Sequence, residues 1–436
     1  MRLTILGGGG FRVPLVHAAL LADRGEGGVT ELVLHDVDAD RLAAIGKVLA
    51  QQAEGVPGAP RVTATTDLAT ALSEVDFVFS AIRVGGMRGR QLDERVALAE
   101  GVLGQETVGA GGVAYGLRTV PVAVEIARRV AELAPRAWVI NFTNPAGMVT
   151  EAMAAYLGPK VIGICDSPVG LCRRVARALG LDPAAVWFDY AGINHLGWLS
   201  AAWYQGEDVL PRLLADRDVV ESFEEGKLFG AEWLRALGAI PNEYLHYYYF
   251  AREALAGAGD GSASRGSFLL DQQRDFYADP ALPVWERARL EREATYMAET
   301  RQGERDSCDL DGGGYEKVAL ALMRAIARDE RTSLILNVRN ENTLPGLPAD
   351  AVVEVPCLVD TNGARPVGVA PLTGHALGLA NELKTVEQAA IEAAATGSRA
   401  AALRAFALHP LVDSVAVARR LLDGYIDAHP ELSYLR

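Results

Sequence analysis

Residues 3–13 read LTILGGGGFRV, and this stretch decides the fold. The apolar run over residues 3–6 predicts a buried strand, and the glycines after it allow a tight turn into a helix that begins near Val13. Glycine also lets a phosphate approach the unpaired N–H groups at the start of a helix. The pattern therefore predicts a dinucleotide-binding turn. Because its spacing departs from Gly-x-Gly-x-x-Gly, a plain strand–helix turn is the alternative.

An acidic residue supports the dinucleotide interpretation. A second apolar run over residues 31–36 ends at Asp36, which follows Gly7 by 36 − 7 = 29 positions. A carboxylate at the end of the second strand can accept hydrogen bonds from a ribose hydroxyl, which favours NAD over NADP. The predicted cofactor-binding residues are Gly7, Gly8, Gly9, Phe11, Asp36, Arg83 and Asn141.

Strand and helix patterns alternate through the first 180 residues. Strands are predicted at 61–64, 77–80, 138–141 and 161–164, with helices at 13–21, 41–51, 117–133, 146–156 and 169–179. Strands separated by helices favour a doubly wound parallel sheet, so we expect an α/β, Rossmann-like NAD-binding domain over residues 1–180.

Strands and helices no longer alternate regularly in the rest of the chain. We expect extended chain at 186–202, a mainly helical stretch at 207–237, a Gly/Ser-rich loop at 256–266, strands of a second sheet at 332–338 and 352–359, and helices at 374–395, 398–407 and 414–428. This pattern predicts a C-terminal α+β, mainly helical domain over residues 181–436, which would bind substrate and metal and form the oligomer.

Composition restricts the partners of the protein. The 436 residues carry 42 basic and 56 acidic side chains, a net charge of −14 that disfavours binding to nucleic acid and to membrane surfaces. No apolar run reaches the roughly 18 residues of a membrane span, and the first strand begins at once, with no room for a signal peptide. We expect a cytoplasmic homodimer or homotetramer with no membrane or nucleic-acid partner, and no disulfide framework from its four cysteines.

Two residues form a candidate metal site. Cys165 follows the predicted strand 161–164, at the edge where ligands bind in open α/β sheets, and His195 lies in a polar break within 186–202. A thiolate and an imidazole suit a first-row divalent metal and leave open positions for a substrate. Taken singly, each is more often a packing residue. Cys308 is expected in a solvated loop rather than in a second metal site.

Two further segments carry candidate polar groups. INFTNP (140–145) ends another strand at the same edge, where asparagine can bind sugar hydroxyls or the cofactor, or Thr143 or Asn144 can cap the next helix. PNEYLHYYYF (241–250) has four tyrosines in six residues, which fits aromatic packing equally well. A tyrosine beside a cation could have its pKa lowered enough to act as a base.

Together these motifs resemble glycoside hydrolase family 4, the NAD- and divalent-metal-dependent glycosidases. The resemblance covers most of the chain and looks closest to the 6-phospho-β-glucosidases, partly through NEYLHYYY (242–249). Its segments are GGGGFRVP (7–14), RVGGMRGRQLDE (83–94), GVLGQETVGAGG (101–112), INFTNPAGMVTEA (140–152), GICDSPVG (163–170) and GINHLGWL (192–199). The ordered set is specific, whereas no single segment is.

The resemblance implies roles for individual residues. Cys165 and His195 match the metal ligands, and Mn2+ is the expected ion. Tyr244 matches the base, Glu106 a residue that raises its basicity, and Asp166 the general acid of some members. Asn144, Arg90 and Arg265 match substrate-binding positions, with both arginines near the sugar phosphate.

The resemblance also implies a reaction: NAD+ oxidises sugar C3, the C2 proton becomes acidic and is removed, the C1–O bond breaks by elimination, and water addition and re-reduction complete a net hydrolysis. The substrate would be a 6-phospho-β-glucoside. Two features depart from the family pattern. Residues 10–14 (GFRVP) replace a small polar residue and an aromatic before Thr-Pro, and Asp166 is familiar in 6-phospho-α-glucosidases. A 6-phospho-α-glucosidase, a glycosidase for unphosphorylated sugars and an ordinary NAD-dependent dehydrogenase are the alternatives.

Overall fold

The computed structural model describes residues 1–23, 25–259, 264–296 and 314–436. Within these residues, thirteen strands form one continuous sheet, in the order β10-β8-β7-β12-β11-β6-β5-β4-β1-β2-β3, with β13 beside β12 and β9 beside β8. The strands are β1 (Arg2–Leu6), β2 (Glu31–His35), β3 (Arg61–Thr65), β4 (Phe77–Ser80), β5 (Trp138–Asn141), β6 (Val161–Gly163), β7 (Trp187–Ile193), β8 (Leu196–Tyr204), β9 (Glu207–Asp208), β10 (Ile240–Pro241), β11 (Thr332–Arg339), β12 (Val352–Asp360) and β13 (Gly363–Pro366).

The six N-terminal strands confirm the predicted Rossmann-like sheet. They are parallel and run in the order β3-β2-β1-β4-β5-β6, that of dinucleotide-binding folds. Ile5 of β1 lies in register with Leu34 of β2 and Phe79 of β4. Ile5 and Leu6 belong to separate hydrophobic clusters, because successive side chains of a strand point to opposite faces. Both faces of this half are therefore buried.

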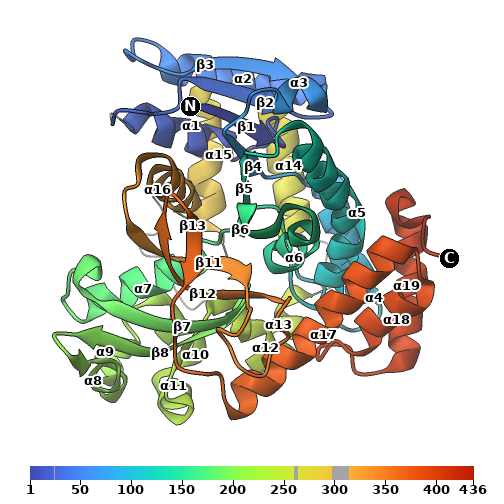
Figure 1. Cartoon of the computed structure of the whole chain (residues 1–436). Coiled ribbons are helices and arrows are strands. Elements are labelled where there is room, and N and C mark those ends of the chain that lie inside the picture. Colours follow the sequence, from blue (N-terminus) through green and yellow to red (C-terminus); the bar gives the residue numbers. More distant parts are fainter. Residues whose placement is uncertain (24, 260–263, 297–313) are drawn as a thin grey trace.

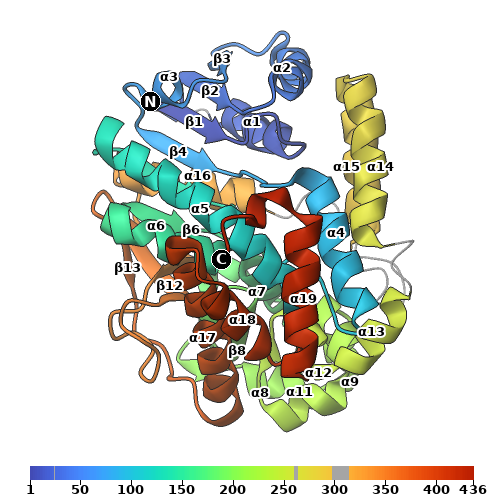
Figure 2. The ribbon, with the colours of Figure 1, turned by 90° about the vertical axis from the view of Figure 1, so that its right-hand side faces the viewer.

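Helices cover the sheet and surround its edges (Figures 1 and 2). The first set is α1 (Val13–Ala22), α2 (Ala39–Ala53), α3 (Leu68–Leu72), α4 (Gly86–Ala99), α5 (Gly109–Leu133), α6 (Ala146–Leu157) and α7 (Ser167–Ala178). The second is α8 (Leu210–Ala215), α9 (Arg217–Val220), α10 (Glu224–Phe229), α11 (Ala231–Leu237), α12 (His246–Tyr249), α13 (Ala251–Ala258), α14 (Arg265–Ala278), α15 (Leu282–Ala294), α16 (Tyr315–Arg328), α17 (Gly374–Thr396), α18 (Arg399–Ala407) and α19 (Val415–Ala428), with short 3-10 turns that include η3 (Glu243–Leu245).

The expected second sheet does not exist as a separate unit. β11 continues the first sheet by pairing antiparallel with β6 at Asn337 and Gly163, and β12 pairs with β7 at Glu354 and Gly192. The added strands give β6 hydrogen-bonding partners that an edge strand would lack. A Cβ at Gly163 would stand 2.8 Å from that of Asn337, so glycine permits this junction. One point of register is too little to be recognised from sequence.

Two other segments differ from expectation. Helix α5 begins at Gly109, eight residues before the predicted start. Its first residues include glycines, which weaken helix propensity and so hid this turn from the sequence pattern. Here the glycines allow close backbone packing, since a Cβ on Gly111 would lie 2.6 Å from the Gln105 carbonyl oxygen. The expected loop at 256–266 contains the end of α13 and the first residues of α14. Its residues 260–263 lie outside the described part of the chain.

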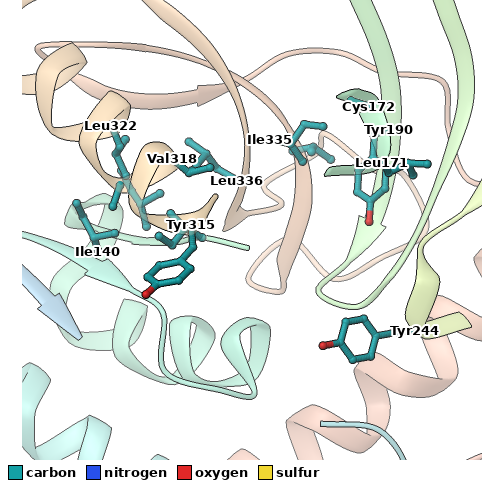
Figure 3. Close-up of a cluster of buried hydrophobic side chains, with 14 of the residues drawn as sticks. Ile140, Leu171, Cys172, Tyr190, Tyr244, Tyr315, Val318, Leu322, Ile335 and Leu336 are labelled. Carbon is teal, nitrogen blue, oxygen red and sulfur yellow. The ribbon is translucent and has the colours of Figure 1, made fainter. Parts of the chain in front are cut away.

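The core extends through both halves of the chain. Figure 3 shows part of one cluster, in which Val318 and Leu322 of α16 lie near Ile140 of β5 and Leu336 of β11. Packing of N-terminal against C-terminal elements holds the two halves together. Among the described residues, none of the helices has the length and apolarity needed to cross a membrane.

Candidate active site

A cavity of about 1470 Å³ opens at the carboxyl ends of the parallel strands. This volume exceeds the usual range for one drug-sized ligand and leaves room for a dinucleotide and a sugar together. The cavity is lined by twelve of the predicted site residues: Gly7, Phe11, Asp36, Arg83, Arg90, Glu106, Asn144, Cys165, Asp166, His195, Tyr244 and Arg265. Gly8, Gly9 and Asn141 do not line it.

The glycine-rich turn shapes one end of this cavity. Gly7 has a φ of +80°, and a Cβ there would lie 2.5 Å from the Ala81 carbonyl oxygen, so both conformation and space require glycine. The Gly9 amide donates to Asp36 Oδ2 at 3.0 Å, and the Asp38 amide donates to Oδ1 at 3.2 Å. Asp36 is thus fixed at the end of β2 with further acceptor capacity toward the cavity.

The two predicted asparagines at the end of β5 have different environments. Asn141 is fully buried, and its amide donates to the Thr143 and Ala146 carbonyl oxygens and to Thr150 Oγ1. Its side chain therefore stabilises the strand–helix connection and does not reach the cavity, unlike Asn144. Neither Thr143 nor Asn144 caps α6, which has Pro145 at its N-cap and no side-chain cap.

Cys165 and His195 line another part of the same cavity, which we call its metal end, in contrast to the dinucleotide end beside the glycine turn. Cys165 occupies the turn between β6 and α7, and His195 the β7–β8 turn, with a left-handed φ of +63° that is unusual for histidine. His195 Nδ1 is hydrogen-bonded to Thr107 Oγ1 at 2.8 Å, which leaves Nε2 for another ligand. Burial lowers the pKa of His195 to about 4, so the ring is neutral, as a metal ligand must be.

The donor set fits a divalent cation. Burial, together with the charges of Glu354 and Asp166, raises the pKa of the Cys165 thiol, so a nearby cation would be needed to hold the thiolate. Cys165 and His195 both line the cavity, and both act on Tyr244: the His195 ring stacks on it, and Cys165 contributes to its raised pKa. The described residues contain no group of three or more histidine, cysteine and acidic side chains that could hold a metal. A two-ligand site of this kind leaves positions open for substrate oxygens. Cys308 lies outside the described residues.

A buried carboxylate supports the histidine turn from behind. Glu354 of β12 accepts hydrogen bonds from Tyr190 Oη at 3.0 Å, from Asn194 Nδ2 at 3.1 Å and from Asn337 Nδ2 at 2.8 Å. Burial raises its pKa to about 7 despite these donors. The network joins β12, β11 and β7 to the residue preceding His195, and sequence alone gave no sign of it.

Tyr244 stacks on His195, with ring centroids 3.7 Å apart and planes 8° from parallel. Its hydroxyl is hydrogen-bonded at 2.9 Å to that of Tyr296, whose hydroxyl also donates to Glu243 Oε1 at 2.8 Å. Burial, and then the charge of Glu243, raises the pKa of Tyr244 well above its usual value. The phenol is therefore protonated unless a cation beside it favours the phenolate.

Glu106 is held by two arginines. It pairs with Arg83 and, through Oε2, with Arg90 Nη1 at 2.6 Å. Burial favours the neutral acid, but Arg83 and Arg90 outweigh it and hold the pKa of Glu106 well below its usual value. Arg90 also donates to Glu94 Oε1 at 2.9 Å, so its guanidinium is occupied by two carboxylates.

Asp166 has the opposite environment. Burial raises its pKa to about 6, with Glu243 and Glu293 adding to the shift and Arg12 opposing it. A carboxyl group that titrates near neutrality suits a general acid. Arg265, at the start of α14, donates to Thr295 Oγ1 and, at 2.6 Å, to the Arg292 carbonyl oxygen, so it ties α14 to the end of α15.

Comparisons with known proteins agree with this arrangement. Residues 2–181 match the model of the family 4 glycosyl hydrolases, and residues 190–412 match that of the family 4 glycosyl hydrolase C-terminal domain. A probable 6-phospho-β-glucosidase of Bacillus subtilis is 34% identical, over 98% of this chain and 96% of its own.

Two solved structures share the whole fold. A 6-phospho-α-glucosidase from gut microorganisms, in complex with NAD and Mn2+, aligns with a TM-score of 0.83 and 28% identity over 98% of this chain and 97% of its own. The 6-phospho-β-glucosidase of Thermotoga maritima with manganese, NAD+ and glucose 6-phosphate aligns with a TM-score of 0.83 and 26% identity over 99% of both chains. The family resemblance is thus confirmed: the chain belongs to glycoside hydrolase family 4 and is a glycosidase.

Proposed function

We propose that this enzyme hydrolyses 6-phospho-β-glucosides with the help of NAD+ and a divalent cation, expected to be Mn2+. The observation that carries the proposal is that one cavity joins a glycine-rich dinucleotide turn to Cys165, His195 and Tyr244. A hydrolase that works by acid and base alone needs no dinucleotide site, and a dehydrogenase needs no leaving-group acid. In this proposal residues 1–180 bind the cofactor, and residues 181–436 complete the substrate site.

Residues at the two ends of the cavity would hold the two cofactors. The turn at Gly7 and the carboxylate of Asp36 would bind the dinucleotide, while Cys165 Sγ and His195 Nε2 would bind the cation. When bound, these groups supply a hydride acceptor for sugar C3 and a positive charge beside the sugar oxygens.

The chain itself would move the protons. Tyr244 would take the proton from C2, since its ring lies against His195 and its hydroxyl is oriented by Tyr296. The negative charge of Glu106 raises the basicity of Tyr244, in the direction that the family resemblance implies. Asp166, with a pKa near 6, would give a proton to the leaving oxygen.

The relatives support a phosphorylated substrate, and they include enzymes for both α- and β-linked glucosides. The names of the similar proteins include both 6-phospho-β- and 6-phospho-α-glucosidases, and the 34% identical relative is of the β type. The aspartate at position 166 favours the 6-phospho-α-glucosidase as the second candidate.

A release assay tests the proposal. The enzyme is freed of NAD+ and metal and assayed with p-nitrophenyl α- and β-glucosides, each with and without a 6-phosphate. We expect cleavage of the 6-phospho-β compound only when NAD+, Mn2+ and a thiol reductant are all restored, without net accumulation of NADH. Undiminished activity without NAD+ and metal would reject the proposed reaction, and steady accumulation of NADH would identify a dehydrogenase.

A further inference from the structure

Glu354 of β12 holds three side chains that come from different segments of the chain. It is fully buried and does not line the cavity. Its Oε1 accepts hydrogen bonds from Asn194 and Asn337, and its Oε2 accepts one from the Tyr190 hydroxyl. Because a carboxylate only accepts hydrogen bonds, all three partners must donate to it, and this fixes the orientation of each partner side chain.

The contact with Asn194 reaches the turn that presents His195, and we call it the His195 branch. His195 has a φ of +63°, which residues other than glycine rarely adopt. Asn194 also packs closely on α6, since a Cβ on Gly147 would lie 3.2 Å from Asn194 Cβ. The hydrogen bond from Asn194 to a buried carboxylate therefore helps to hold the turn in the conformation that places the imidazole at the cavity.

The contact with Tyr190 extends to the segment that presents Tyr244, and we call it the Tyr244 branch. Tyr190 Oη donates to Glu354 and accepts a hydrogen bond from Asn242 Nδ2 at 3.2 Å. Asn242 Oδ1 in turn accepts from the Tyr244 amide at 3.1 Å and so caps η3. Figure 3 shows the Tyr190 hydroxyl pointing to the side on which Tyr244 lies. A Cβ on Gly197 would lie 2.4 Å from this hydroxyl, so glycine leaves the room that the branch needs.

The contact with Asn337 lies beside the strand that leads to Cys165. Asn337 is in register with Gly163 at the end of β6, which precedes Cys165 by 165 − 163 = 2 residues. The charge of Glu354 also contributes to the raised pKa of the Cys165 thiol. All three hydrogen bonds of this carboxylate therefore lead to segments that carry a predicted metal ligand or the predicted base.

Stability of the fold alone does not explain a carboxylate at this position. Burying a carboxylate costs free energy, and apolar side chains of similar volume often serve a core equally well. The reaction, however, needs a fixed geometry between two rings from separate turns: His195 and Tyr244 lie 244 − 195 = 49 residues apart in the chain, yet their centroids are 3.7 Å apart. Glu354 is an anchor that both turns share.

We propose that Glu354 is a positioning residue that fixes the imidazole of His195 and the phenol of Tyr244 relative to each other, an inference that rests on the proposed function. The His195 branch would set the direction of Nε2 toward the cation, and the Tyr244 branch would set the place of the hydroxyl that takes the proton. Supporting residues of this kind typically change metal affinity or activity by about 10- to 100-fold when they are substituted.

Glu354→Gln tests the proposal, with Glu151→Gln of α6 as the matched control. Glu151 also supports β12, since its Oε2 accepts a hydrogen bond from the Val352 amide at 2.8 Å, and it does not line the cavity. Metal-free enzyme with NAD+ bound is titrated with Mn2+ in a calorimeter, and each holoenzyme is assayed at saturating Mn2+ on the p-nitrophenyl glucoside that the wild type cleaves. We expect Glu354→Gln to weaken Mn2+ binding and to lower kcat, each about 10- to 100-fold. Glu151→Gln should lower Tm and leave both quantities near their wild-type values.

Two further variants keep Glu354 in place and test its branches separately, so they decide the question even if Glu354→Gln does not fold. Asn194→Ala breaks the His195 branch and should weaken Mn2+ binding about tenfold or more, with a smaller change in kcat at saturating Mn2+. Tyr190→Phe breaks the Tyr244 branch and should lower kcat about tenfold, with KM and Mn2+ affinity near those of the wild type.

The outcomes separate this inference from the proposed function. Glu354→Gln with the Mn2+ affinity and kcat of Glu151→Gln would overturn the positioning role, as would branch variants that change Mn2+ affinity and kcat to the same extent. A wild type that cleaves its glucoside at full rate without NAD+ and Mn2+ would refute the proposed function, and the inference with it.

Discussion

The dinucleotide end of the cavity depends on backbone shape, whereas the metal end depends on the chemistry of buried side chains. At the dinucleotide end, Gly7 and Gly9 act through backbone shape, and the turn holds the charged side chains of Asp36 and Arg41 through the Gly9 backbone. At the metal end, Cys165, His195 and Tyr244 act through side chains whose pKa values burial has shifted far from normal. Backbone shape needs only a local sequence, whereas shifted side chains need a whole buried environment. Substitutions at the two ends should therefore fail in different ways.

The largest expected effect is at the metal end. Cys165→Ala should lower kcat/KM by at least about 10³-fold, because several kcal/mol of charge stabilisation depend on the ion that Cys165 would hold. Calorimetric titration with Mn2+ should show lost binding, while NAD+ affinity persists. Cys172→Ala, which removes a buried thiol from the same helix region, is the control. Full Mn2+ affinity in Cys165→Ala would contradict the assignment.

Next in size is the loss of the base. Tyr244→Phe should reduce kcat by about 10²- to 10⁴-fold with little change in KM, since the hydroxyl acts on a proton and not on ground-state binding. A deuterium at sugar C2 should slow the variant at least as much as the wild type. Tyr248→Phe, whose ring packs against His409 away from the cavity, should retain full activity. Equal losses in both variants would remove Tyr244 from the reaction.

A smaller effect is expected at the dinucleotide end. A Cβ on Gly9 would lie 2.7 Å from Arg41 Cβ and 3.0 Å from Asp36 Oδ2, so Gly9→Ala should displace the turn and weaken NAD+ binding about tenfold or more. Mn2+ affinity should not change, which would sharpen the contrast between the two ends. Gly46→Ala, in α2 with open space around it, should leave NAD+ binding intact and stabilise the helix by about 0.5–1 kcal/mol.

The smallest expected effect is at His409, which does not line the cavity. It tests the pH dependence of folding stability independently of the pH dependence of the active site. Burial lowers the pKa of His409 to about 3, and its Nδ1 accepts a hydrogen bond from the Leu411 amide. Because the unfolded state binds a proton near pH 6.5 and the folded state does not, this side chain should cost about 1.4 kcal/mol of stability between pH 7.5 and 5.5.

His409→Asn keeps an acceptor near Nδ1 and removes the titration, so its unfolding free energy should fall less over this range, as urea unfolding at both pH values can measure. A variant with the same pH dependence as the wild type would show that His409 is not the residue that titrates.

The sequence predicts well what is local. The turn after β1, the strand ends that present Cys165 and Asp36, and the parallel pairing of the first six strands all follow from short apolar runs and glycines. Asn141 shows the limit of this reasoning, because its position at a strand end did not reveal that its amide is used inside the fold.

Contacts between segments far apart in the chain could not be predicted from the sequence. Tyr296 and Glu354 reach the site through packing of α15 and β12, which no periodicity reports. The pairing of Asn337 with Gly163 that turns two expected sheets into one is equally invisible from sequence.

The most direct test of the central claim, that a sugar is transiently oxidised where NAD+, the cation and Tyr244 meet, is hydrolysis in D2O followed by NMR of the released sugar phosphate. Removal of the C2 proton and its return from solvent predicts deuterium at C2 of the product, and none in the metal-free enzyme or in Tyr244→Phe. A product formed at full rate with only protium at C2 would contradict the account.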